Sequence, residues 1–145
     1  MFIKNKFITC LFVYFIFISF SLAKENYYDE AKKNFDKKEL ELSKFLFQKN
    51  IVFHPKDAKS YLYLAKIFNL EENEKEEEKN LDTTLLLDPA NEEAMYMLIK
   101  IKLKKSNYSK VQDLKEKFAI ICKKLCEKTK EINKTLKNIE PKNDT

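Results

Sequence analysis

The chain has 145 residues, of which 44% are hydrophobic, and a formal charge of +5. This length limits it to one small domain with appendages. The sequence contains no glycine, which excludes glycine-rich phosphate loops, dinucleotide fingerprints and nucleophile elbows and disfavours tight β-hairpins. All 28 basic residues are lysine, although phosphate and guanine are usually recognised by arginine. We therefore expect an all-α protein that binds neither a cofactor nor nucleic acid.

Residues 1–23 have the pattern of a secretory signal peptide. Lys4 and Lys6 precede an apolar run over residues 7–20, and small residues follow up to Ala23, as a signal peptidase requires. The run is shorter than the roughly 20 residues that span a bilayer. We expect cleavage and export, to the periplasm if the cell is bacterial. The alternative is that the segment stays as a membrane anchor.

The rest of the chain repeats its apolar pattern with a period of 34 residues, the spacing of Pro55 and Pro89. Paired helices with this period are typical of tetratricopeptide repeats, and the chain resembles three such units over residues 24–120. The resemblance implies a right-handed α-solenoid of antiparallel helix pairs. The positions that carry it are Tyr27, Ala31, Phe35, Phe47, Ile51 and Phe53 in the first unit, Tyr61, Leu64, Ala65, Phe68, Leu81, Leu85 and Leu87 in the second, and Met95, Leu98, Ile99 and Tyr108 in the third.

Several residues depart from the family pattern. Glu77 stands where the family prefers a small residue for close helix contact, and Asn50 and Thr84 replace a usual alanine. Because glycine is absent, we expect asparagines to adopt the left-handed backbone at the helix ends; the candidates are Asn69, Asn73 and Asn107. We expect burial between helices for Tyr27, Tyr61, Leu64, Phe47 and Leu81.

An acidic run over residues 71–78 opens the second helix of the middle unit. We interpret it as a solvated first turn, in which carboxylates complement the helix dipole. The alternative is an acidic patch that recruits a basic partner.

The C-terminal part, residues 109–140, is predicted to be one long lysine-rich helix with an apolar stripe from Leu114 to Ile139. We expect it to cap the repeat stack, because such stacks need a terminal helix with a polar outer face. The alternative is contact with an anionic membrane surface. Residues 141–145 are expected to form a disordered tail.

Cys122 and Cys126 are four residues apart. On a continuous helix their Cβ atoms would be about 5–6 Å apart, whereas a relaxed disulfide needs roughly 3.5–4.5 Å. A bridge between them therefore requires local unwinding. We prefer two packed thiols and keep a redox pair as the alternative. Two cysteines do not provide the about four ligands of a zinc site.

The family resemblance implies a non-enzymatic interaction module, exported as a scaffold or assembly factor. The single histidine, His54, lies at a turn without a nucleophile nearby. The alternatives are a membrane-anchored tether and a thiol-redox helper that uses Cys122 and Cys126. In the family, the first helix of each unit lines a concave groove that binds a peptide or a partner protein. The groove positions here are Tyr28, Lys32, Leu62, Lys66, Tyr96 and Lys100.

Three of these positions, Lys32, Lys66 and Lys100, recur at the 34-residue period. A regular stack would align their ammonium groups in a row beside the row of Tyr28, Leu62 and Tyr96. Such a surface favours an extended segment with acidic groups or a free C-terminal carboxylate. The alternative is that these lysines are simply solvated.

Overall fold

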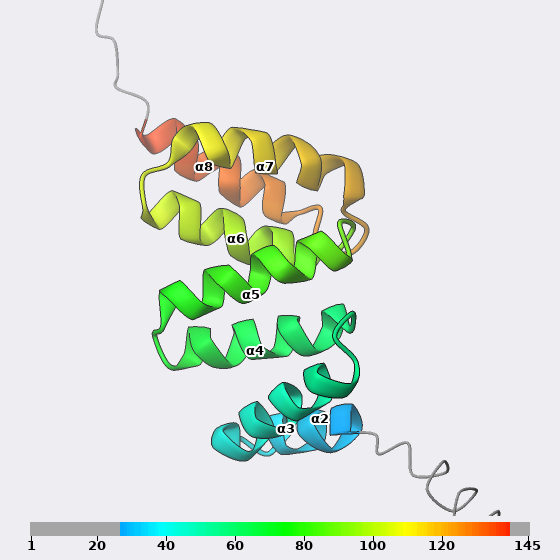
Figure 1. The fold of residues 1–145 in the computed structure, drawn as a ribbon. Coiled ribbons are helices and arrows are strands. Elements are labelled where there is room, and N and C mark those ends of the chain that lie inside the picture. Colours follow the sequence, from blue (N-terminus) through cyan, green and yellow to red (C-terminus); the bar gives the residue numbers. More distant parts are fainter. Residues whose placement is uncertain (1–26, 140–145) are drawn as a thin grey trace, which may run out of the picture.

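The computed structural model describes residues 27–139, which form helices and turns without a strand. Adjacent helices run in opposite directions and stack as pairs, with the last helix folded back onto the end of the stack (Figure 1). This confirms the expected α-solenoid of helix pairs. The predicted signal segment and tail lie outside the described residues. The helices are α2 (Tyr27–Asp36), α3 (Leu40–Phe53), α4 (Ala58–Leu70), α5 (Glu74–Leu87), α6 (Glu92–Lys104), α7 (Tyr108–Ile121) and α8 (Lys128–Ile139).

The 34-residue period of the sequence is also the period of the backbone. The second helices of the three pairs, α3, α5 and α7, begin and end at residues offset by 34, and so do α4 and α6. The turn inside each pair contains one residue in the left-handed region: Lys38 (φ 67°), Glu72 (φ 56°) and Ser106 (φ 55°). This region favours glycine, and the chain fills it with three unrelated residue types.

The expectation that asparagine adopts the left-handed backbone is wrong. Asn73 and Asn107 each lie one residue later, where they cap the next helix. Their side-chain oxygens accept hydrogen bonds from the backbone N–H groups of Glu76 (3.3 Å) and Lys110 (3.2 Å). An asparagine stabilises this N-terminal position because it satisfies a helix donor that has no partner within the helix.

The core consists of two hydrophobic clusters, one on α2, α3 and α4 and the other on α4 to α8. Phe47 and Leu81 are fully buried at their centres, and Tyr27 and Leu64 are also buried, as predicted. The prediction is wrong for Tyr61, which is only half-buried. Its hydroxyl donates to the carbonyl of Pro55 at 3.3 Å, so the ring lies over the turn that enters its own helix.

The single helix predicted for residues 109–140 is two helices, α7 and α8, separated by a turn. The carboxylate of Glu92 on α6 accepts hydrogen bonds from the backbone N–H groups of the three turn residues 123–125. A disulfide joins Cys122 to Cys126, with their Cα atoms 5.2 Å apart. The preference for packed thiols is therefore wrong. The bridge lies where the helix is unwound, because Cβ atoms four apart on an intact helix are too distant.

The break lets α8 fold back beside α6 and α7, where it buries Ile132 and Leu136. The apolar side of α8 is thus used inside the protein, as a capping helix requires. Ile132 and Leu136 are therefore not exposed for the membrane contact considered as the alternative role of this helix. None of the described helices combines the length and the apolar character needed to cross a bilayer.

The acidic run of α5 forms ion pairs within the chain. Glu78 pairs with Lys102 and Lys105 on and just after α6, and Glu74 pairs with Lys104 at 2.7 Å. These contacts lower the pKa of both carboxyls, chiefly through hydrogen bonds from Lys102 to Glu78 and from Lys104 to Glu74. The run therefore joins α5 to α6, a role that neither sequence-based interpretation included.

Candidate functional site

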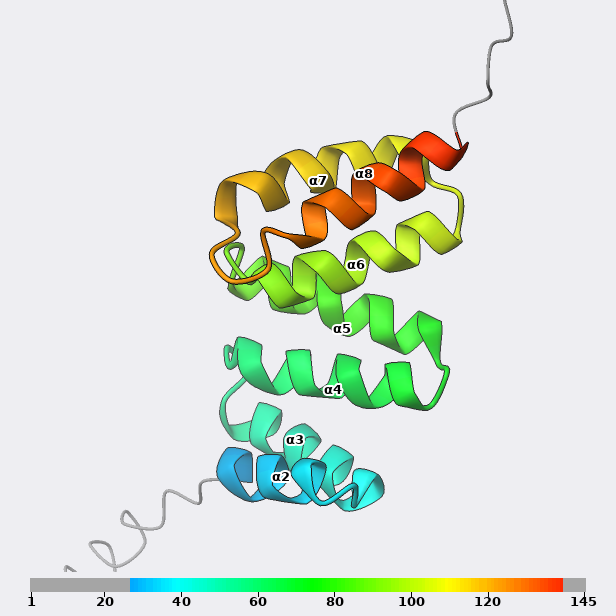
Figure 2. The ribbon, with the colours of Figure 1, turned by 180° about the vertical axis from the view of Figure 1, so that it is seen from behind.

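The first helices of the pairs and α8 follow one another along one side of the stack (Figure 2). The second helices α3, α5 and α7 lie on the side that faces the viewer in Figure 1. The six groove positions predicted from the sequence all lie on α2, α4 and α6. We refer to this surface as the groove face.

An aromatic cluster forms the N-terminal half of the groove face, with Tyr63 at its centre. The ring of Tyr63 stacks on Phe47 at 5.0 Å and meets the edges of Phe35 (5.1 Å) and Tyr28 (6.0 Å). Burial raises the pKa of Tyr28 to about 12, and its neighbour Tyr63 adds to the shift. A side-chain hydrogen bond between Tyr28 and Tyr63 contributes to the same pKa shift, so the two hydroxyls interact within the cluster.

The three predicted lysines differ in their surroundings. Lys32 pairs with Asp36 at 3.0 Å within its own helix. Lys66 pairs with Glu93 of α6 at 2.8 Å, and its Nζ atom lies 4.8 Å from the centre of the Tyr63 ring. Lys100 is exposed and forms no ion pair with another described residue. The structure thus places the three lysines at equivalent positions of α2, α4 and α6. Of the three, only Lys100 has no ion-pair partner among the described residues.

Tyr96 connects the groove face to the capping helix. Its hydroxyl donates to the Glu131 carboxylate on α8 at 2.9 Å, and Lys128 Nζ lies 5.7 Å from the ring centre. Burial raises the pKa of Tyr96, and the hydrogen bond to Glu131 adds to this. Leu62 is buried in the hydrophobic core, so of the six predicted positions it offers the least surface to a ligand.

A hollow of about 770 Å³ opens between the C-terminal end of α4, the start of α5 and the middle of α6. Glu77 lies in this hollow with only 5% of its surface exposed. Asn69 donates to its carboxylate at 3.1 Å, yet burial raises the pKa of Glu77. Lys100 and Met97 of α6 line the same hollow.

Glu77 in this hollow is the departure noted in the sequence. The residues 34 positions away on either side, Ser43 and Val111, are small or medium-sized and fully buried. The glutamate at this place brings a carboxylate into the hollow. The family pattern marks this position as a departure but does not indicate a functional role for it. The hollow also depends on α6, which is remote in sequence.

The described residues contain no group of three or more His, Cys, Asp and Glu side chains arranged to hold a metal ion. The described residues of the groove face include an aromatic cluster, the three lysines and the buried carboxylate of Glu77. An extended polypeptide can be bound by such groups through stacking, hydrogen bonds and charge.

No protein-family model matches the sequence, and no curated protein matches it either. Solved structures do match. The first TPR domain of Spaghetti (RPAP3), bound to the HSP90 peptide SRMEEVD, superposes with a TM-score of 0.68 at 12% identity, covering 78% of this chain and 90% of that one.

Two further structures are similar. For the TPR2B domain of yeast Sti1 in a pHsp70 complex the TM-score is 0.62 at 17% identity, covering 77% of this chain and 90% of that one. For the Sgt2 TPR domain from Aspergillus fumigatus the TM-score is 0.65 at 13% identity, covering 83% of this chain and 81% of that one. The chain therefore has the tetratricopeptide-repeat fold, with about three repeats closed by a capping helix.

Proposed function

We propose that the protein is a non-enzymatic interaction module that binds an extended segment of a partner protein along its groove face. The observation that carries the proposal is the groove face itself, where α2 and α4 carry an aromatic cluster and α6 carries Lys100 in the wall of the hollow. The fold supports this, because two of the similar solved structures are TPR domains in complexes, with an HSP90 peptide and with pHsp70.

The partner segment is proposed to direct an acidic group or its C-terminal carboxylate toward Lys100. Lys32 and Lys66 already have carboxylate partners, so a ligand anion has to compete for them. Lys100 has no ion-pair partner among the described residues, with Glu77 and Glu131 as electrostatic neighbours. The peptide bound by the Spaghetti domain ends in EEVD, which supports the proposal of an acidic ligand. Tyr28, Lys32, Lys66 and Tyr96 would line the path of the segment, with Leu62 beneath it.

Photo-cross-linking tests this proposal in the native cell. A photoreactive phenylalanine analogue replaces Met97 in the hollow, and in a control chain it replaces Lys79 on the outer side of α5, which is exposed. We expect the Met97 position to capture a discrete partner through one short segment, and the Lys79 position to capture none. Capture of the same partner only at Lys79 would overturn the proposal.

We also propose that residues 1–23 direct export and are removed, so that the module acts as a scaffold or assembly factor outside the cytoplasm. The support is the charge and apolar pattern of that segment. N-terminal sequencing of the native protein is the test. A start at Lys24 supports export with cleavage, whereas a start at Met1 in the membrane fraction supports the anchored alternative.

A thiol-redox role is the second candidate, and the Cys122–Cys126 disulfide favours it. The test is the replacement of both cysteines by serine. Loss of a thiol-dependent activity with unchanged partner capture at Met97 would support this role. Unchanged activity would leave the disulfide as a structural bridge.

A further inference from the structure

The ends of the second helices carry a row of exposed apolar side chains. Val52, Leu86 and Ile120 follow one another at intervals of 34 residues, with 76%, 80% and 84% of their surfaces exposed. They occupy the last-but-one position of α3, α5 and α7, so the regular stack places them in one line. Phe53 beside Val52 is 60% exposed. We call these four residues the apolar edge.

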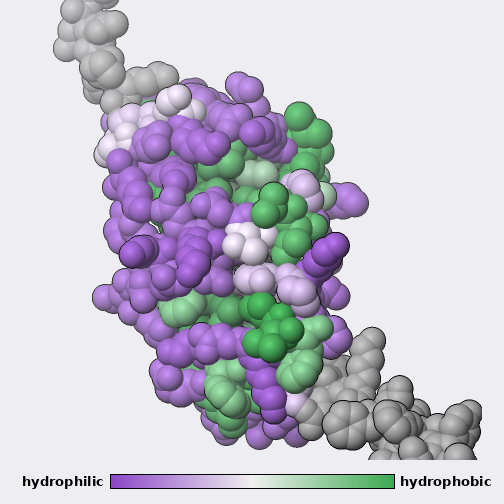
Figure 3. Space-filling view, viewed as in Figure 1, coloured by the Kyte–Doolittle hydropathy of each residue, from purple (hydrophilic) through white to green (hydrophobic). Residues whose placement is uncertain are grey.

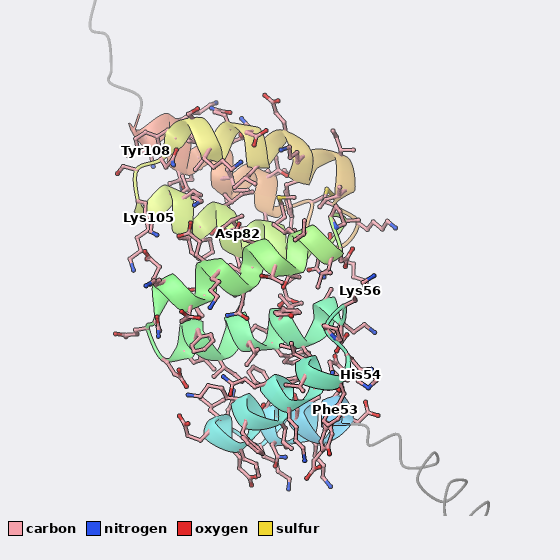
Figure 4. The ribbon with its side chains drawn as sticks, viewed as in Figure 1. Phe53, His54, Lys56, Asp82, Lys105 and Tyr108 are labelled. Carbon is pink, nitrogen blue, oxygen red and sulfur yellow. A yellow bond between two sulfur atoms is a disulfide. The ribbon has the colours of Figure 1, made fainter. Side chains whose placement is uncertain are left out.

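Hydrophobic surface gathers where these helices end, on the right-hand side of the space-filling view (Figure 3). Phe53, His54 and Lys56 lie at this side, while Lys105 and Tyr108 lie at the opposite ends of the helices (Figure 4). A shallow apolar hollow of about 510 Å³ extends the edge between α5 and α7, lined in part by Leu85 and Ile121. The groove face is formed by other helices, so the apolar edge is a separate surface.

Three carboxylates near this edge, those of Asp57, Asp88 and Glu92, are engaged within the protein, whereas Asp82 and Glu127 are exposed. Asp57 accepts hydrogen bonds from Asn50 (2.9 Å) and Ser60 (2.7 Å). Asp88 accepts one from Asn91 at 3.0 Å. The carboxylate of Glu92 is occupied by the backbone of the α7–α8 turn. These three carboxylates are therefore oriented toward internal donors.

The lysines at the same edge are not paired in this way. Lys56 follows Phe53 in the α3–α4 turn, and Lys123 and Lys124 follow Ile120 in the α7–α8 turn. All three are exposed, and none forms an ion pair with another described residue. The edge therefore presents apolar side chains beside ammonium groups that have no ion-pair partner among the described residues, the combination that binds an anionic lipid surface.

The start of the described chain lies at this same edge. The ring of Tyr27, the first described residue, stacks on Phe53 at 5.7 Å. The 26 residues before it include the apolar run over residues 7–20. In the anchored alternative, in which residues 1–23 are retained, the described part of the chain would begin next to the apolar edge.

A second copy of this chain is a poorer occupant. A parallel pairing of two edges would place the lysine-bearing turns against their own copies. An antiparallel pairing would place Lys56 against Lys123 and Lys124 of the second copy. Like charges therefore face each other in both orientations, which disfavours association.

We propose that the apolar edge is a membrane-docking surface, on which Val52, Phe53, Leu86 and Ile120 enter the interface of an anionic bilayer while Lys56, Lys123 and Lys124 contact lipid headgroups. Docking at this edge leaves the groove face open to its peptide. The inference concerns a surface other than the groove and does not depend on the proposed peptide binding.

A single tryptophan reports on this docking, because the sequence contains none. The full chain carries Leu86→Trp as the probe or, as a matched control, Lys75→Trp, which lies exposed at the other end of the same helix. Each is mixed with phosphatidylcholine vesicles with and without phosphatidylglycerol. With the anionic vesicles we expect a blue-shifted emission and quenching by brominated acyl chains for Leu86→Trp, and neither effect for Lys75→Trp.

Second-site changes in the Leu86→Trp chain separate the contributions. Val52→Ser with Ile120→Ser should weaken vesicle binding at least tenfold, and Lys56→Glu with Lys124→Glu should do the same for the anionic vesicles. The proposal is overturned if anionic vesicles leave the emission of Leu86→Trp unchanged. This holds even if the chain binds the vesicles in a flotation assay, because binding would then occur through its N-terminal segment. A blue shift that depends on protein concentration without lipid would also overturn it, because it indicates self-association.

Discussion

The carboxylate of Glu92 lies 2.7 Å from the backbone nitrogen of Lys123, a residue 31 positions further along the chain. The same side chain accepts from the N–H groups of Lys124 and Leu125. One carboxylate thereby replaces the helical partners that these donors would have in a continuous helix. This contact fixes where α7 ends and lets α8 return over the core.

Replacing Glu92 by Gln should weaken the attachment of the α7–α8 turn in a pH-dependent way. The hydrogen bonds from the backbone, that of Lys123 above all, lower the pKa of the Glu92 carboxyl from its ordinary value of 4.5. The stabilisation by the Glu92 carboxylate is therefore complete above pH 4.5, the pKa of the unfolded state. It is lost as the pH falls through the lower pKa of the folded state. Wild type should lose its advantage in Tm over Glu92→Gln below about pH 4.5. A constant difference in Tm down to pH 2 would contradict this.

Removing the Cys122–Cys126 bridge should destabilise the turn without unfolding the chain. A bridge that closes so short a loop restricts the unfolded chain by about 2 kcal/mol in the chain-entropy estimate. The variant with both cysteines replaced by serine should unfold at correspondingly lower denaturant, and a reducing agent should lower wild type to the same midpoint. If reductant shifted the double variant as well, the effect would not come from this disulfide.

Truncating Ile132 to Ala should measure the capping role of α8. Ile132 is 2% exposed, so the change should cost about 2–4 kcal/mol in the free energy of unfolding. Ile120→Ala is the matched control, because this isoleucine is 84% exposed and its loss in lipid-free buffer should stay within about 0.5 kcal/mol. Equal effects would show that α8 does not cover the core. Deleting residues from Ser109 onward, which removes α7 and α8, should cause aggregation.

Glu77→Gln should stabilise the protein at neutral pH. Burial raises the pKa of Glu77, so the ionised form is disfavoured in the folded state. The free-energy cost of ionising Glu77 in the folded state is absent at low pH. It develops as the pH rises from the pKa of the unfolded state, 4.5, to the higher pKa of the folded state. The gain in Tm should therefore appear above that range and vanish below about pH 4. A Tm gain of the same size at pH 3 would contradict this.

The lysine row should contribute to partner binding. Lys66→Glu reverses the charge beside Tyr63 and breaks the pair with Glu93, so we expect roughly threefold weaker binding of the captured partner. Lys79→Glu is the control, because it also breaks one surface pair, with Glu76, away from the groove. Lys134 is unsuitable as a control, since it lies 34 residues after Lys100 on α8. Similar losses of affinity in both variants would show that the lysine row has no special role in partner binding.

The repeat register was predictable from the sequence, because many apolar positions recur at intervals of 34 residues. Leu64, Leu98 and Ile132 are buried at intervals of 34 residues, and the apolar periodicity of the chain is sufficient to indicate this pattern. The break before α8 was not predictable, since it depends on Glu92 in another helix. The ion pair between Lys66 and Glu93 was not predictable either, because the two residues lie on different helices. Local sequence predicts helices, whereas partners of charged side chains depend on the packing of distant segments.

Hydrogen exchange of the full chain, with and without the partner captured at Met97, tests the central claim most directly. Groove binding predicts slower amide exchange in α4, α6 and the first turn of α5 on complex formation, with the amides of α3 and of the rest of α5 unchanged. Slower exchange confined to α3, α5 and α7 would place the partner on the opposite side of the stack and contradict the account.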